Sequence, residues 1–411
     1  MPINLSRLGT FNTYDSAIRN LSTRQTSLAS LQEELTSGKR VVRPSDDPTA
    51  AAQAERALTR ISRVDTDQRA LSLQRNAVTS AESTLGEAVD AVQSFRELVV
   101  NAGNGAYTQA ERNSLAEQMT TLRNQIFSMA NRTDSNGLPL FSGLGSTATP
   151  FVDSAGGVQY NGLGGQRAST DVTVPYSLDG NATWMNVPTG NGVFVTNAAG
   201  TNTGTAYTNV GQVTNPAAIT GDSYSITFTA PVPPATGATT YDVVDTTTST
   251  PVVSGQPYTT GQAIAFGGMS VTVTGAPANG DSFTVAPSTR TSIFGVLDKA
   301  IADVKNGATA SGTTNIGVLS QNVTQALTQI DNGLSRLQTS RGLAGDMMNT
   351  ADRIDSSQQK RSTQLEADRS NAEDLDMVKG ISDFQNQQTG YQAALQSYAM
   401  IQKLSLFNFL S

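Results

Sequence analysis

The chain has 411 residues, a formal net charge of −7, and neither cysteine nor histidine. Its length allows two or three domains with their own cores. The missing side chains exclude thiol nucleophiles, Ser-His-Asp triads and most zinc sites, so we expect no catalytic, cofactor-binding or metal-binding residues. The net negative charge argues against sequence-independent binding of nucleic acid.

The first residues lack the basic flank and apolar core of a cleavable signal peptide, so we expect none. The chain also has no run of about 18 apolar residues, so we expect no membrane span. If the protein leaves the cell, we expect an export route that does not require a cleavable signal peptide.

The first predicted helix runs from about Asn12 to Ser37. Its apolar residues recur every seven positions, which is typical of a coiled-coil seam. They are Tyr14, Leu21, Leu28 and Leu35. Gly38 follows this helix. The position just after a helix end favours a residue that can adopt the left-handed backbone conformation.

A second heptad repeat covers residues 50–100. At about 1.5 Å per residue this helix is roughly 75 Å long, so it must lie along other long helices. Its repeating residues are Ala57, Val64, Leu71, Val78, Leu85, Val92 and Val99.

The loop between these helices has three cations, two acids and two prolines in residues 38–48. Asp46 or Asp47 can accept bonds from free amides of the next helix, and Pro48 suits its first position. One interpretation is a simple helix connector. The other is a stiff, charged corner that contacts a neighbouring subunit, through residues that include Arg40, Arg43, Pro44, Asp46 and Asp47.

A third helix is predicted after a capping box formed by Thr108 and Glu111. Its apolar stripe is spaced three and four apart, and we expect it to be buried in helix packing. The stripe consists of Leu115, Met119, Leu122, Ile126 and Met129.

Composition changes sharply between Thr133 and Thr289, where the only charged residues are eight Asp and Arg167. Alternating segments in this stretch predict strands, for example 223–228, 240–244, 269–274 and 282–285. We therefore expect an inserted β-rich domain over residues 144–290.

Asp222 and Asp281 each follow a glycine and precede a predicted strand. Two acids can flank a glycosidic bond, so a carboxylate enzyme is one hypothesis. The favoured interpretation is structural, because an Asp in such a turn bonds its own backbone.

Helical patterning returns at Ile293 and continues to the end of the chain. The last helix repeats the coiled-coil seam with Ile381, Phe384, Tyr391, Leu395 and Tyr398. The final residues are apolar, which indicates either a surface for a partner or a segment folded back on the helices. The apolar residues of this tail are Leu404, Leu406, Phe407, Phe409 and Leu410.

These elements predict an α+β fold, in which long terminal helices form a coiled-coil or helical bundle around the β-rich insertion. We expect three parts. They are a terminal coiled-coil domain (1–48 and 370–411), a helical bundle domain (49–143 and 291–369) and the outer domain (144–290).

Residues 35–48 (LTSGKRVVRPSDDP) resemble the amino-terminal signature of bacterial flagellins and flagellar hook-associated proteins. Residues 136–143, 186–192 and 404–407 are similar to the members that join hook to filament. The resemblance implies a non-enzymatic, secreted subunit of the bacterial flagellum, exported without a cleaved signal.

The resemblance also implies its partners: further copies of itself in a ring, other hook-associated proteins, flagellin, and an export chaperone. Within that arrangement the subunit interface would include the loop residues named above and the seam residues Leu21, Leu28, Leu35, Tyr391, Leu395 and Tyr398. The apolar tail would bind the export chaperone. Alternatives are flagellin itself, or an exported glycan-binding or adhesive protein that acts through its insertion.

Overall fold

The computed structural model describes residues 10–145, 149–231, 237–306 and 315–409. The chain divides into two compact units. Unit 1 contains the chain up to Arg69 and again from Asp355, and unit 2 contains Ala70–Ile354. The α+β class expected from the sequence is confirmed, because long helices from both ends of the chain flank the antiparallel strands.

The first four long helices begin and end close to the predicted positions, whereas the break between the last two was not predicted. The long helices are α1 (Thr10–Ser37), α2 (Pro48–Ala102), α3 (Gln109–Ala130), α5 (Ile293–Lys305), α6 (Ile316–Glu373) and α7 (Met377–Phe409). The Thr108–Glu111 capping box that opens α3 is present, with both reciprocal bonds formed. Thr108 and Glu111 therefore satisfy free amides at the start of α3, as the sequence predicts.

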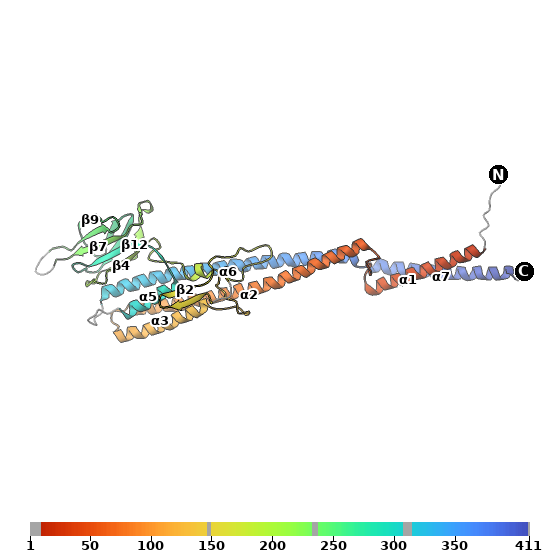
Figure 1. The fold of residues 1–411 in the computed structure, drawn as a ribbon, viewed down its shortest axis with the longest axis horizontal. Coiled ribbons are helices and arrows are strands. Elements are labelled where there is room, and N and C mark those ends of the chain that lie inside the picture. Colours follow the sequence, from red (N-terminus) through yellow and green to blue (C-terminus); the bar gives the residue numbers. More distant parts are fainter. Residues whose placement is uncertain (1–9, 146–148, 232–236, 307–314, 410–411) are drawn as a thin grey trace. The chain divides into compact units, whose positions relative to one another are not determined.

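In unit 1, α1 and α7 lie side by side (Figure 1). They run antiparallel, since Gly380 packs against Leu35 near one end of the pair and Gly390 packs against Arg24 further along. A methyl group added at Gly380 would lie 3.2 Å from Leu35 Cδ2. The lack of a side chain at Gly380 therefore allows the two helices to approach closely.

In unit 2, α2 and α6 also run antiparallel, as two exposed ion pairs between them show. Arg75 pairs with Asp352 and Arg96 pairs with Asp331. Helices α3 and α5 complete one apolar core, which buries α2 residues such as Leu85 and α3 residues such as Met119. This core confirms the expected burial of the α3 stripe.

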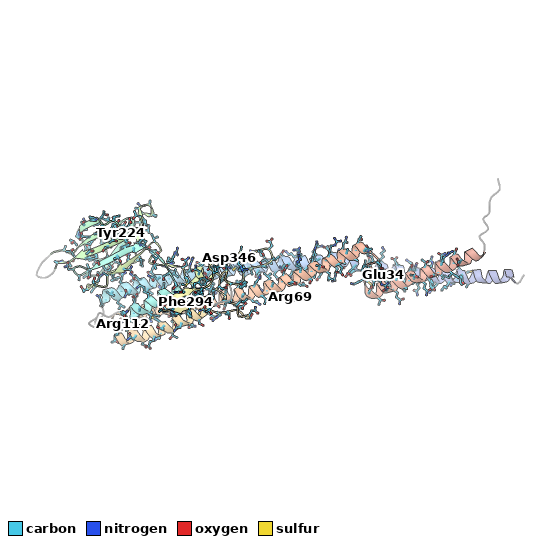
Figure 2. All side chains as sticks on the ribbon, in the orientation of Figure 1. Glu34, Arg69, Arg112, Tyr224, Phe294 and Asp346 are labelled. Atoms are coloured by element: carbon cyan, nitrogen blue, oxygen red, sulfur yellow. The ribbon has the colours of Figure 1, made fainter. Side chains whose placement is uncertain are left out.

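The first part of the insertion also packs into this helical core. It contains β1 (Phe151–Ser154), β2 (Gly157–Tyr160), α4 (Gly180–Trp184) and β3 (Val187–Pro188), the last of which pairs with β13 (Arg290–Thr291). Trp184 is fully buried, and its ring stacks on that of Phe294 from α5 at 5.9 Å. Figure 2 shows Phe294 among the helices of this unit.

Later strands form two antiparallel sheets around a second apolar core. One sheet has the order β4 (Phe194–Ala198), β12 (Ser282–Pro287), β7 (Tyr224–Thr229), β8 (Thr240–Asp245) and β9 (Thr250–Pro257). The other joins β10 (Ala263–Phe266), β11 (Met269–Thr274), β5 (Tyr207–Thr208) and β6 (Gln212–Val213). Alternate residues of β7 point into this core, as period-two patterning predicts.

Side-chain amides in the first half of α6 form hydrogen bonds with the β-rich insertion. Gln321 Oε1 accepts bonds from the amide of Thr208 at 2.6 Å and from its hydroxyl at 3.0 Å. Gln325 Nε2 donates to the carbonyl of Thr196, and Asn332 donates to two backbone carbonyls beside β3. The two apolar cores are separate, so these polar contacts contribute to the position of the sheets on α6.

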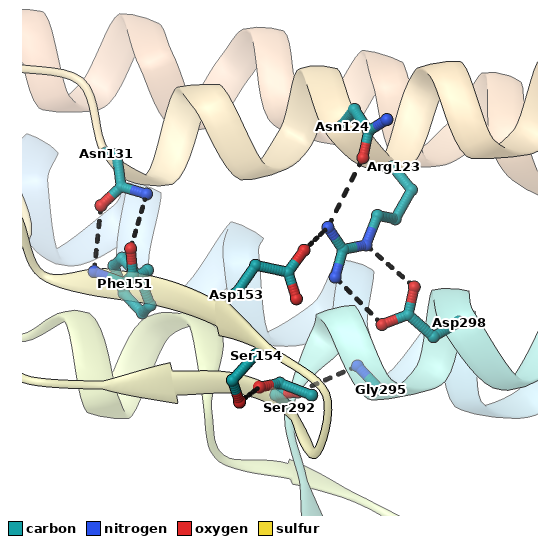
Figure 3. Close-up of polar contacts among 10 residues, drawn as sticks. Arg123, Asn124, Asn131, Phe151, Asp153, Ser154, Ser292, Gly295 and Asp298 are labelled. Atoms are coloured by element: carbon teal, nitrogen blue, oxygen red, sulfur yellow. Dashed lines mark hydrogen bonds and ion pairs between the residues drawn. The ribbon is translucent and has the colours of Figure 1, made fainter.

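A buried arginine of α3 joins two other elements of unit 2 (Figure 3). Arg123 of α3 donates through Nε and Nη2 to both carboxylate oxygens of Asp298 on α5, at 2.8 and 3.1 Å. Its Nη1 donates to Asp153 of β1. Burial alone would lower the pKa of Arg123, but its hydrogen bonds to Asp153 and Asp298 outweigh burial and raise the pKa above its usual value.

Candidate assembly surfaces

The loop from Gly38 to Pro48 is held against the break between α6 and α7. Gly38 has φ of +70°, the left-handed conformation expected at the end of α1. The amides of Arg40 and Val41 both donate to the carbonyl of Glu373, and the amide of Leu375 donates to the carbonyl of Gly38. These bonds join the first and last parts of unit 1.

Charged side chains of this loop have partners within the chain. Arg40 pairs with Asp47 at 3.2 Å and donates to the carbonyl of Ala372 at 2.8 Å. Arg43 pairs with Glu33 of α1 at 2.6 Å. The loop therefore acts as a helix connector, and its contact with a neighbouring subunit stays a prediction.

The acids of the loop stabilise its backbone. Asp46 Oδ2 accepts from the amide of Arg43 at 2.8 Å, and Asp47 Oδ1 accepts from the amides of Thr49 and Ala50. Pro48 is the first helical residue, as predicted. Bonds from the Ala50 amide, the Thr49 hydroxyl and Arg40 lower the pKa of Asp47 to about 2.

The α1 and α7 seams are only partly covered by each other. Leu21, Leu28 and Leu35 are half-buried, as are Tyr391 and Tyr398. The seam residues Ile381 and Leu395 of α7 remain exposed, at 46% and 42%, as does Ile18 beside the seam of α1, at 41%. The side chain of Tyr14 lies outside the described residues. Apolar seam surface on both helices is thus left open to solvent.

The tail falls mostly outside the part of the chain that the structure describes. The backbone of α7 continues to Phe409, so Leu404, Leu406, Phe407 and Phe409 are helical. Their side chains, and the whole of Leu410, lie outside the described residues. Their role as a partner surface stays a prediction.

The geometry of the two acids in the insertion excludes a paired carboxylate site. In the register of β7 and β12, Ser282 lies opposite Thr227 and Val285 lies opposite Tyr224. Asp222 and Asp281 therefore lie at opposite ends of the strand pair, roughly 20 Å apart at about 3.3 Å per residue. Glycosidase carboxylates lie within about 10 Å of each other.

Asp281 has a structural role instead. Its side chain is 3% exposed and accepts from the amides of Thr203, Gly204 and Ala278 at 2.8 to 3.0 Å. These bonds close the turn before β12, which supports the structural interpretation of that residue.

The described residues contain no group of three or more acidic side chains placed to hold a metal ion. Within the same ranges, no helix combines the length and apolar character needed to cross a membrane.

Comparisons with known proteins relate this chain to flagellar proteins. Residues 9–146 match the family described as the bacterial flagellin N-terminal helical region. The flagellar hook-associated protein 3 of Salmonella typhimurium is 33% identical over 168 residues, which are 40% of this chain and 50% of that relative. This chain thus spans about half the length of such curated relatives.

Two solved structures are similar over almost their entire length. Flagellar hook-associated protein 3 from Legionella pneumophila is 30% identical with a TM-score of 0.70, over 76% of this chain and 97% of that one. A structure of the flagellar junction protein FlgL from Legionella pneumophila is 32% identical with a TM-score of 0.66, over 73% and 99%.

Proposed function

The chain belongs to the flagellar hook-associated protein 3 family, and from this premise we propose that it is the structural subunit that joins hook to filament in the bacterial flagellum. It has no enzymatic role in this proposal. Many copies assemble with other components of the flagellar axis, outside the cell.

The observation that carries this proposal is the open seam of α1 and α7. A two-helix coiled coil with a seam every seven residues buries only a narrow stripe. Leu395 and Ile381 are more than two-fifths exposed although they occupy apolar seam positions. Further copies of the chain, packed in a ring, would cover this surface, and each buried side chain contributes about 1.5 to 3 kcal/mol.

The charged loop belongs to the same subunit interface in this proposal. Its residues there are Arg40, Arg43, Pro44, Asp46 and Asp47. Arg43 and Asp46 are exposed, so each can exchange its partner in the chain for one on the next subunit. A single exposed pair contributes little, and the effect comes from repetition around the ring. The neighbours on either side are other hook-associated proteins and flagellin.

Before assembly the apolar tail needs a cover, which we assign to an export chaperone. The tail comprises Leu404, Leu406, Phe407, Phe409 and Leu410. Removing residues 404–411 is expected to leave the thermal unfolding of the monomer nearly unchanged while it abolishes incorporation and weakens chaperone binding. A large loss of melting temperature would instead assign the tail to the monomer's own core.

The direct test is deletion of the gene. The proposal expects intact hooks and flagellin released unpolymerised into the medium.

Complementation with Arg43→Glu should restore expression and helix content but not junction assembly, whereas Arg167→Glu, in the insertion, should assemble normally. Normal filaments in the deletion strain would contradict the proposal, and normal motility with Arg43→Glu would remove the loop from the interface.

Two alternative functions predict different results. If the protein is the filament subunit, the deletion strain should contain no flagellin, rather than release it into the medium. A glycan-binding or adhesive protein would retain binding in full-length variants whose seams are disrupted, which Leu28→Asp would show.

A further inference from the structure

The exposed face of α2 in unit 1 carries a stripe of three arginines. Arg56, Arg60 and Arg63 are spaced four and three residues apart, so they share one helix face. All three are exposed. Among the described residues, none of them takes part in an ion pair, although Asp67 follows Arg63 by four positions. We call Arg56, Arg60 and Arg63 the arginine stripe.

Three heptads further along α2, the equivalent positions are covered. Arg56, Arg60 and Arg63 correspond there to Ala77, Ala81 and Thr84, which are 2%, 1% and 0% exposed in the core of unit 2. The heptad register holds across this distance, because Ala57, Val64, Leu71, Val78 and Leu85 are all buried. One face of one helix is therefore small and covered in unit 2, but cationic and uncovered in unit 1.

The stripe also borders a hollow between α2 and α6. It has a volume of about 370 Å³, and its walls include Gln53, Arg56 and Arg60 from α2 and Leu365, Asp368 and Asn371 from α6. Asp368 bonds the amide of Gln364 and forms no ion pair with the stripe within the described ranges. The hollow therefore presents charged groups of both signs next to the arginine stripe. A charged helix surface could bind there.

We propose that the arginine stripe docks an acidic helix face of a second copy of this chain, formed by Asp90 and Glu97 of α2. Both acids are exposed, and neither carboxylate has a hydrogen-bond or ion-pair partner among the described residues. They are seven residues apart, as Arg56 and Arg63 are, so each pair spans about 10.5 Å. Their charges and spacing are complementary.

The like charge of the stripe also bears on the symmetry of the contact. A two-fold axis through the stripe would place the stripes of two copies against each other, which is repulsive. When the stripe of one copy binds the acidic pair of the next, and its own acidic pair binds a third copy, the contact is heterologous, and such contacts build rings or filaments. The inference therefore rests on the proposed function and specifies one of its interfaces.

Charge reversal tests this contact in cells that lack the native gene. Arg56→Glu with Arg63→Glu, and separately Asp90→Arg with Glu97→Arg, should each lower incorporation at hook tips by about tenfold. A chain with all four substitutions restores attraction between copies and should recover to within about twofold of the original protein. Lys360→Glu with Arg361→Glu is the matched control, since both are exposed cations of α6, and it should assemble normally.

The outcomes separate this inference from the proposed function. If the unmodified chain fails to incorporate, the junction function itself is wrong. If the unmodified chain incorporates and the stripe variant matches it, or the fourfold variant stays as defective as either pair, only the arginine stripe contact is wrong. Binding of the unmodified protein to phosphatidylglycerol vesicles, lost with the stripe but without an assembly defect, would assign the stripe to a membrane surface and overturn the inference. Circular dichroism of each variant confirms that it is folded.

Discussion

Two heptad repeats of the same period differ in how far the chain buries them. Along α2 the repeated residues are at most 5% exposed, from Ala57 through Leu85 to Val99. In α7 the seam residues Ile381 and Leu395 are more than two-fifths exposed, and the seam leucines of α1 are only half-buried. A heptad repeat thus specifies a helix with a seam, but the segments that pack against the helix determine whether the seam is buried.

The reason lies in what each seam contacts. In unit 2, α2 shares a core with α3, α5 and α6, so apolar residues on several of its faces are covered. In unit 1, α1 packs along one helix, α7. We expect the buried seam to supply stability to the monomer and the open seam to supply association.

The largest expected effect compares matched leucines in the two seams. Leu85→Ala removes a fully buried side chain and should cost about 2 to 5 kcal/mol of unfolding free energy, whereas Leu28→Ala should cost less than about 1 kcal/mol. Denaturant unfolding followed by fluorescence of Trp184, the single tryptophan, reports unit 2. Circular dichroism reports the helices of both units. Equal losses for the two variants would contradict the comparison.

A second comparison concerns arginines. Arg123→Met breaks ion pairs whose arginine side chain is 7% exposed, and should cost about 2 kcal/mol because Asp298 and Asp153 lose a charged donor. Arg43→Met breaks a pair whose members are 65% and 45% exposed, and should cost about 1 kcal/mol or less. Unfolding monitored by circular dichroism measures both. A greater loss at Arg43 would show that the loop pair is integral to the monomer.

Limited proteolysis tests the difference in local stability. Trypsin should cut after Arg19 and Arg24 of α1 before it cuts after Arg96 of α2, because a segment with few buried contacts opens with little free energy. Mass spectrometry of early fragments identifies the order of cleavage. Resistance of the first 40 residues in the monomer would indicate a closed seam. The assembled protein is the control, since the proposed ring protects the same arginines.

The smallest expected effect is acid titration of the loop in unit 1. The folded pKa of Asp47 is about 2, below its ordinary value of 3.8. Its contribution to stability is therefore present above pH 3.8 and is lost as the pH falls through 2. The NMR signal of the Ala50 amide, which donates to Asp47, should shift over that window. Asp47→Asn should remove the shift, and an unchanged profile in that variant would exclude Asp47 as its source.

Much of this architecture follows from local sequence. Gly38 and Pro48 mark the loop because one favours a left-handed conformation and the other lacks an amide donor. The Thr108 box marks the start of α3, and the Asp-only, glycine-rich composition marks the insertion. These features depend on residues within a few positions of each other, so the amino-acid sequence by itself determines them.

The tertiary structure decided what depends on distant neighbours. It places the break between α6 and α7 at Asp374–Asp376, where Gly38 and Arg40 bond the backbone around Glu373. It joins the first part of the insertion to the helical core through Trp184. It also leaves the arginine stripe uncovered. Burial depends on which helices lie alongside, and residues far apart in the chain supply those helices, so a periodic pattern alone cannot specify it.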